Sequence, residues 1–167
     1  MTNTTRLIIL NICGFLVQVI LTIATYQKSK KKYCTYIIAS RVPDVPTYFL
    51  ANDYPSISFS LLGALRAFLT YKEKYTLKIA NIFEALIISA TLFLNKKGAW
   101  VIFPLIGTTI SNYYFLFKDI KKIVLWSFIN NLIYIDYFIF IENYAGAIML
   151  IGATIAQIPA VINNYKN

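Results

Sequence analysis

The chain has 167 residues, of which 58% are hydrophobic and only 14% are charged. A soluble domain carries roughly 25% charged residues, so the composition excludes an ordinary soluble globule, a disordered tail and a disulfide-based scaffold. The net charge of +9 would suit a nucleic-acid-binding protein, but most Lys and Arg residues border long apolar runs, where they anchor loops at lipid headgroups. We therefore predict an all-α integral membrane protein that binds no nucleic acid.

Apolar runs close to the length of about 20 residues that a spanning helix needs alternate with short polar breaks. We expect seven transmembrane helices, at residues 7–26, 33–51, 56–71, 77–94, 100–117, 123–141 and 145–163. The first run is too long for the core of a signal peptide and no small-residue cleavage site follows it, so we expect a retained helix. Because the breaks are short, neighbouring helices should be antiparallel.

The distribution of Lys and Arg predicts the orientation of these helices. Alternate breaks place eleven of these residues on one side of the membrane and three, Arg6, Lys96 and Lys97, on the other. Because cytoplasmic loops carry the excess of positive charge, we expect the N-terminus outside and the C-terminus in the cytoplasm. The predicted location is the cell (inner, cytoplasmic) membrane, crossed several times, and an odd number of helices satisfies both ends.

The predicted helices divide into two similar triplets. Residues 1–75 form a first triple-helix repeat, residues 76–98 a linker helix, and residues 99–167 a second triple-helix repeat. Within each triplet a basic break precedes an uncharged-to-acidic one, and residues 52–54 (NDY) correspond to residues 142–144 (ENY). The linker helix lets both triplets run the same way, which predicts a 3+1+3 arrangement of parallel repeats about an axis along the membrane normal.

Two stretches of sequence resemble known membrane proteins. Residues 61–70 (LLGALRAFLT) and 103–111 (FPLIGTTIS) each resemble a segment of the bacterial YgjV-type inner membrane proteins. The 3+1+3 arrangement resembles the SWEET and PQ-loop superfamily of small transporters. The resemblance implies a small transporter fold.

The chain departs from the SWEET-like pattern at the substrate site. SWEET-like transporters place a binding asparagine on the third helix of each triplet, whereas here the third helices offer Ser58 and Ser60 in one triplet and Thr154 and Gln157 in the other. The Pro-Gln pair that gives the PQ-loop group its name is also absent. A sugar site therefore does not carry over residue by residue.

Five ionisable side chains fall at membrane depth, where each costs about 2.5–3.5 kcal/mol to insert and is a functional candidate by default. Arg41 and Asp44 share a helix face, either as a pair that neutralises itself or as the lining of a pocket. Arg66 and Glu84 match in depth on consecutive helices, which favours a structural ion pair. Asp136 is either a proton or cation site, because burial raises the pKa of a carboxylate, or the partner of a neighbouring tyrosine.

Prolines and asparagines complete the candidate site. Prolines within the second helix remove backbone donors and should bend or break it, and interrupted helices point to transport sites. The asparagine pair of the sixth helix either contacts a ligand or joins two helices by hydrogen bonds. The predicted substrate-binding residues are Arg41, Asp44, Asn130, Asn131, Asp136 and Gln157, and the predicted hinges are Pro43, Pro46 and Pro159.

The leading hypothesis is a small-solute transporter that moves a polar metabolite, such as a sugar, a carboxylate or a vitamin-like compound, by alternating access around a midplane site between the triplets. The lipid bilayer and the solute are the expected partners, a proton is a candidate coupling ion, and the oligomeric state stays open. The alternative is a non-transporting receptor or protein-interaction module on the same fold.

An enzyme is not expected, because the chain has no histidine, no nucleophile elbow and no carboxylate cluster with metal-ligand spacing. We therefore predict no catalytic residue, no metal and no cofactor. Cys13 and Cys34 are predicted to lie too far apart to form a disulfide and to remain free thiols.

Overall fold

The computed structural model describes residues 3–96 and 98–166, without the side chains of residues 160 and 163–166. Lys97, one of the residues in the charge count, lies outside the described residues. The described chain is helical throughout and contains no strand. Its elements are α1 (Asn3–Thr25), α2 (Lys30–Leu50), α3 (Tyr54–Tyr71), α4 (Leu77–Leu94), the 3-10 helix η1 (Gly98–Val101), α5 (Ile102–Tyr114), α6 (Ile120–Phe140) and α7 (Tyr144–Lys166).

Each of the seven predicted runs forms a helix, and the fifth is shorter than predicted at both ends. The sequence predicts one helix over 100–117, whereas a 3-10 turn occupies Gly98–Val101 and the α-helix ends at Tyr114. After the α-helix, the N–H groups of Leu116 and Phe117 each donate a hydrogen bond of 3.0 Å to the carbonyl oxygen three residues earlier. Such tightened turns are common where helices begin and end.

Helix α2 passes through Pro43 and Pro46 without interruption. The prediction of a broken helix was therefore wrong, although each proline still removes one main-chain donor. Helices α1 and α3 pack along α2, and we attribute its continuity to this support from both sides. The roles of Pro43, Pro46 and Pro159 as hinges stay predictions.

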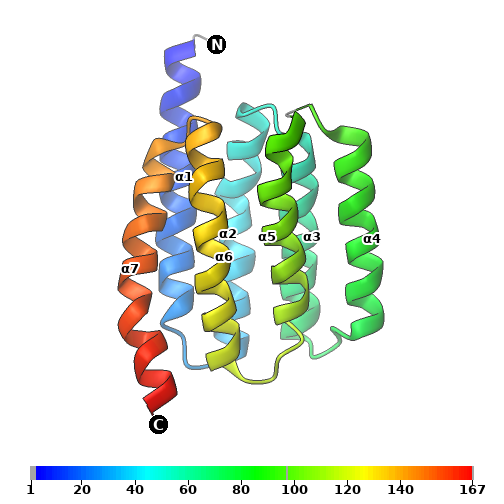
Figure 1. Ribbon diagram of the computed structural model, residues 1–167, viewed down its shortest axis with the longest axis vertical. Coiled ribbons are helices and arrows are strands. Elements are labelled where there is room, and N and C mark those ends of the chain that lie inside the picture. The colour runs from blue at the N-terminus through cyan, green and yellow to red at the C-terminus, as the bar shows by residue number, and fades with distance from the viewer. Residues whose placement is uncertain (1–2, 97, 167) are drawn as a thin grey trace.

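Six of the helices form a closed ring (Figure 1). Helix α1 packs on α2 and α7, α2 on α3, α3 on α5, α5 on α6, and α6 on α7. Helix α4 lies at the edge of the molecule, where it packs on α3 and α5 outside the ring. The interior of the ring is therefore built by helices from both ends of the chain.

The turns that connect α2 to α3 and α6 to α7 share one backbone geometry. Asn52 and Glu142 adopt left-handed φ angles of 55° and 63°, as the residue that ends a helix often does. The following side chains, Asp53 and Asn143, accept hydrogen bonds from main-chain N–H groups of the next helix, at 3.4 Å and 3.0 Å. Helices α2 and α6 both have 21 residues and start 90 positions apart, at 30 and 120.

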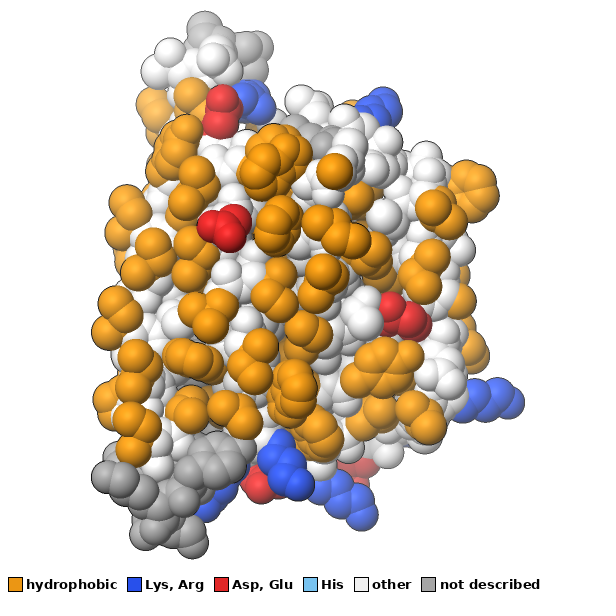
Figure 2. All heavy atoms as spheres, viewed as in Figure 1, with side chains coloured by type: hydrophobic (Ala, Val, Ile, Leu, Met, Phe, Trp, Pro, Cys, Tyr) orange, Lys and Arg blue, Asp and Glu red, His pale blue; other side chains and the backbone are white. Residues whose placement is uncertain are grey.

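The distribution of side chains is the reverse of that in a soluble protein. Gln18, Asp44 and Arg66 are at most 3% exposed, whereas Val42 and Phe93 are 76% and 85% exposed. Figure 2 shows apolar side chains across the middle of one face and Lys and Arg side chains towards its two ends. Since charged residues are almost never fully buried in soluble proteins, this pattern indicates a surface that contacts lipid.

Three of the described helices, α1, α4 and α6, are long and apolar enough to cross a membrane by length and composition alone, and α7 has a shorter apolar stretch. Helix α2 falls outside this group because its first turn is basic and polar side chains line its inner face. Helix α5 has only 13 residues. Composition thus identifies fewer spans than the number of packed helices.

Two apolar clusters fill the two ends of the ring. The first apolar cluster, near the N-terminus, consists of Leu10, Tyr48, Ala51, Tyr137, Phe138, Ile141, Ala147 and Leu150. The second apolar cluster, at the opposite end, consists of Ala24, Tyr33, Cys34, Ile37, Ala67, Tyr114, Phe115 and Ile123. The inward-facing residues between these clusters surround the centre of the ring.

Candidate functional site

A polar cavity lies between the two apolar clusters. Its volume is about 70 Å³, and a smaller space of about 50 Å³ adjoins it. Because a buried water needs about 10–15 Å³ on this measure, the cavity holds several waters or one small solute. All six ring helices contribute to its wall, and no described residue of α4 does. Its polar lining consists of Gln18, Arg41, Asp44, Tyr48, Ser56, Ser60, Arg66, Thr108, Ser111, Tyr114, Asn130, Asn131 and Tyr134.

Arg41 and Asp44 are both an ion pair and part of the cavity wall. Arg41 donates from Nη1 to Asp44 Oδ2 at 2.6 Å, and the Ser60 hydroxyl donates to the same oxygen at 2.7 Å. The Asp44 carboxylate is buried, whereas the Arg41 side chain remains 22% exposed. The two interpretations of the sequence, self-neutralisation and pocket lining, are therefore both correct.

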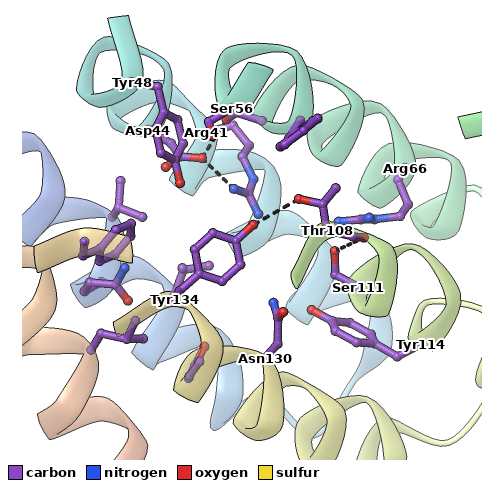
Figure 3. Close-up of a pocket in the computed structure, with 18 residues that line it drawn as sticks. Arg41, Asp44, Tyr48, Ser56, Arg66, Thr108, Ser111, Tyr114, Asn130 and Tyr134 are labelled. Carbon is purple, nitrogen blue, oxygen red and sulfur yellow. Dashed lines mark hydrogen bonds and ion pairs between the residues drawn. The ribbon is translucent and has the colours of Figure 1, made fainter. Parts of the chain in front are cut away.

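Tyr134 approaches this pair from the opposite side of the ring. Its hydroxyl lies 3.0 Å from the Thr108 hydroxyl and 3.3 Å from the Pro104 carbonyl oxygen. Figure 3 shows the Arg41 guanidinium and the Tyr134 hydroxyl pointing toward one another across the cavity. Helices α2, α5 and α6 thus bring polar groups to one place from parts of the chain that are distant in sequence.

Arg66 turns into the cavity from α3 and is only 3% exposed. Its guanidinium lies 4.8 Å from the centre of the Phe115 ring, a cation–π contact. A Cβ atom added at Gly63 would lie 3.5 Å from Arg41 Nε and 3.6 Å from Arg66 Nη2. Two guanidinium groups therefore flank Gly63, with Asp44 as the only carboxylate that lines the cavity among the described residues.

The predicted ion pair between Arg66 and Glu84 does not form. Glu84 instead accepts hydrogen bonds from the Thr109 hydroxyl at 2.6 Å and the Asn112 amide at 3.0 Å. The physical reason is the position of α4: it lies outside the ring, so Glu84 meets the outer side of α5 while Arg66 faces the cavity. Arg66 and Glu84 were expected at the same depth in the membrane, but their side chains point to different sides of α5.

Tyr75, in the connection before α4, belongs to the same network around α5. Its hydroxyl donates to the Asn112 side chain and, at 3.0 Å, to the Asn112 carbonyl oxygen. Burial raises the pKa of Tyr75 to about 12, so the phenol stays protonated and remains a donor at physiological pH. The network attaches α4 to the ring.

The remaining predicted site residues divide into two groups. Asn130 and Asn131 line the cavity, and Gln157 lines the adjoining space, where its side-chain oxygen accepts a long hydrogen bond of 3.5 Å from Asn131. Asp136 does not belong to the site, because it is exposed on the outer side of α6. It lies two residues from Tyr134, and successive helical positions are about 100° apart, so these two side chains point away from each other.

Five polar atoms of the cavity wall are buried without a hydrogen-bond partner. In native proteins such groups are rare and each calls for an explanation, such as a bound molecule or ordered water. The atoms are Gln18 Oε1, Arg41 Nε, Ser56 Oγ, Arg66 Nε and Asn130 Oδ1. Their convergence makes this cavity the candidate site for a polar molecule or for ordered water.

Sequence reasoning missed several of these wall residues. Gln18 offered a signal, since it is an amide in the middle of a long apolar run. Thr108 and Tyr134 offered none, because Thr is common in membrane helices for packing reasons and Tyr is common near the membrane interfaces. Among the described residues, no group of three His, Cys, Asp or Glu side chains comes together to hold a metal.

The family model of Imp-YgjV, described as bacterial inner membrane protein, matches residues 8–167. The chain belongs to this family. The resemblance seen in residues 61–70 and 103–111 is therefore confirmed at the level of the family, and both stretches contribute side chains to the cavity, among them Arg66 and Thr108. No curated protein and no solved structure matches the chain.

Proposed function

We propose that this Imp-YgjV family protein is a small-solute transporter of the inner membrane, and that its solute binds in the central cavity. The observation that carries the proposal is the set of five unpartnered polar atoms around one cavity. Burial of a polar group without a partner costs about 1–3 kcal/mol. A wall with five such groups therefore destabilises the fold unless a polar molecule binds to it. A packed structural core would have paired these groups.

The proposal includes seven spanning helices in a 3+1+3 arrangement, with the N-terminus outside. It is supported by the shared geometry of the turns at Asn52 and Glu142. The excess of Lys and Arg in the loops on one side of the membrane supports it too. Helices α2 and α3 would span despite their lower hydropathy, and α5 despite its short length, because their polar side chains face the cavity and their apolar side chains face lipid. A relationship to SWEET-like transporters is part of the proposal.

Contacts between neighbouring elements lie at both ends of the ring, where the gates of an alternating-access protein would be. At the end near the N-terminus, Arg6 bonds Glu142 at 2.8 Å and the Leu50 carbonyl oxygen at 2.9 Å. At the opposite end, Lys30 Nζ donates to the carbonyl oxygens of Phe115 and Phe117 at 2.9 Å and 2.6 Å. Transport would require each set of contacts to break in turn while the other holds.

Cysteine accessibility tests this proposal. In a background carrying Cys13→Ala and Cys34→Ala, Asn131→Cys places a thiol in the cavity wall, and Leu132→Cys places one on the adjacent, 50% exposed outward position. We expect a small membrane-impermeant thiol reagent to modify the Asn131→Cys protein from both sides of a vesicle membrane. The Leu132→Cys protein is the matched control and should be protected by lipid.

The outcomes separate a transporter from the non-transporting alternative. Modification of the Asn131→Cys protein from both sides, and its slowing by a solute that the protein binds, would support alternating access. Modification from one side only would indicate a receptor-like pocket. Complete inertness under every condition would contradict the proposal, because a transport site must meet water.

A further inference from the structure

The chain has seven acidic residues, and none of them neutralises Arg66. Three are paired with other cations: Glu142 with Arg6 at 2.8 Å, Glu73 with Lys31 at 3.0 Å and Asp44 with Arg41 at 2.6 Å. The other four act elsewhere. Glu84 accepts from Thr109 and Asn112, Asp53 from Tyr137, Asp119 from the main chain at the start of α6, and Asp136 lies on the outer side of α6.

The cavity therefore holds one positive charge in excess. Arg41 and Arg66 contribute two positive charges and Asp44 one negative charge, and an arginine stays protonated in proteins. No hydrogen bond or ion pair joins the described Arg66 guanidinium to another residue, and its Nε atom is buried without a partner. Because a buried charge is costly unless it is paired, the missing counter-charge must come from a molecule that enters the cavity.

We propose that the solute is a small monocarboxylate whose carboxylate group binds Arg66. This inference rests on the proposed function and names its substrate class. One negative charge makes the cavity neutral. A neutral sugar would leave Arg66 unpaired, and a dianionic phosphate would give the cavity an excess negative charge. A planar carboxylate also matches the two parallel donors of a guanidinium, and a volume of about 70 Å³ admits only a small molecule.

Two amides of the cavity wall are placed to bind the same group. Gln18 and Asn130 both line the cavity, and each has a side-chain atom without a partner. Either amide presents its NH₂ group to an anion after rotation of the terminal bond. Arg66 is the group that distinguishes an anion from a neutral polar solute, because it alone carries an uncompensated charge.

Gly63 allows a test that needs no knowledge of the solute. A Cβ atom there would make ordinary contacts with both guanidinium groups, the nearest being 3.5 Å away. Gly63→Asp therefore supplies a carboxylate from the chain itself, and Gly63→Asn adds a neutral side chain of the same shape. We expect the purified Gly63→Asp protein to melt at least about 2 °C above the Gly63→Asn protein, and to be insensitive to added carboxylates.

Matched solutes test the substrate class directly. Acetate and propionate should raise the Tm of the purified protein with rising concentration, while acetamide, propionamide and sodium chloride at equal ionic strength should not. Arg66→Gln should abolish the response and Arg66→Lys should retain part of it. Lys31→Gln removes one positive charge from an exposed position outside the cavity, where the side chain is 60% exposed, and should leave the response intact.

The outcomes separate this inference from the proposed function. Stabilisation by neutral solutes alone, or equal stabilisation by chloride, would overturn the monocarboxylate and leave a solute-binding protein. If no solute in the panel acts, the comparison at Gly63 decides. A higher Tm for Gly63→Asp than for Gly63→Asn would support an anion site with a different carboxylate as ligand, and equal values would overturn it.

Discussion

Gly14 lies where α1 meets the turn between α6 and α7, against the buried side chain of Asn143. Asn143 in turn caps α7 by accepting a hydrogen bond from the Gly146 N–H at 3.0 Å. A Cβ atom at Gly14 would overlap the Asn143 amide. At the scale of single residues, the absence of a side chain at this position is thus what lets the two ends of the chain approach.

Gly14→Ala should lower the free energy of unfolding by about 1–3 kcal/mol, the usual cost of an extra methyl group in a packed site. Thermal unfolding of the detergent-purified protein measures the change. Gly152→Ala is the matched control, since no atom lies within 4 Å of the added Cβ, and alanine there should be neutral or stabilise by up to about 1 kcal/mol. Equal stability of the two variants would mean that Asn143 moves freely.

The hydroxyl of Tyr137 donates to Asp53, and both residues are fully buried. Tyr137→Phe should destabilise the protein by about 1–3 kcal/mol, because one acceptor of a buried carboxylate loses its donor. Tyr144→Phe removes the hydroxyl of a tyrosine that is 54% exposed and should change stability by less than about 0.5 kcal/mol. Thermal melts of both variants measure the difference, and similar losses would contradict the role assigned to the buried bond.

At the scale of helices, α4 is attached to the ring without taking part in the cavity. Its contacts are with α3 and α5, and Glu84 binds the outer side of α5 through Thr109 and Asn112. The charges of Arg66 and Glu84 therefore serve different ends: one faces the cavity and the other fastens a peripheral helix.

A double-mutant cycle tests this separation. The effects of Arg66→Gln and Glu84→Gln on the free energy of unfolding should be additive within about 0.3–0.5 kcal/mol, as expected for residues that share no partner. Unfolding of the two single variants and the double variant gives the coupling energy. A coupling clearly larger than this would restore the ion pair that the sequence suggested.

At the scale of the whole molecule, the proposed transport requires the contacts at the two ends of the ring to break in turn. Arg6, Glu142 and the Leu50 carbonyl oxygen join α1, α2 and the α6–α7 turn. The side chains of Arg6 and Glu142 are 27% and 49% exposed, and partly exposed ion pairs contribute only about 0–1 kcal/mol. These contacts are therefore weak enough to break in the proposed transport.

Arg6→Gln should speed the modification of an Asn131→Cys protein by a membrane-impermeant reagent added on the side of the N-terminus. Access from the opposite side should slow, because opening one end of an alternating-access protein closes the other. The Tm should fall by only a few degrees at most, as for the loss of about 1 kcal/mol or less. An unchanged rate on both sides would show that the closure does not depend on Arg6.

The sequence by itself determined the membrane class, the seven helices and the family, because long apolar runs and their polar breaks are local properties of the chain. It also singled out Arg41, Asp44, Asn130 and Asn131, which line the central cavity, since polar groups at membrane depth are costly wherever they occur. The correspondence between the turns at residues 52–54 and 142–144 was visible because both breaks contain similar polar residues.

Only the tertiary structure decided which way each polar side chain faces. Asp136 and Glu84 satisfied the same criterion of depth as Arg41, yet one lies on the outer surface and the other on the peripheral helix α4. The direction in which a side chain faces depends on which helices pack side by side, and the polar residues between the helices do not determine that packing. The unpaired charge of Arg66 emerged only when all seven acidic residues had been placed, because an excess of charge in a cavity belongs to the arrangement and to no single residue.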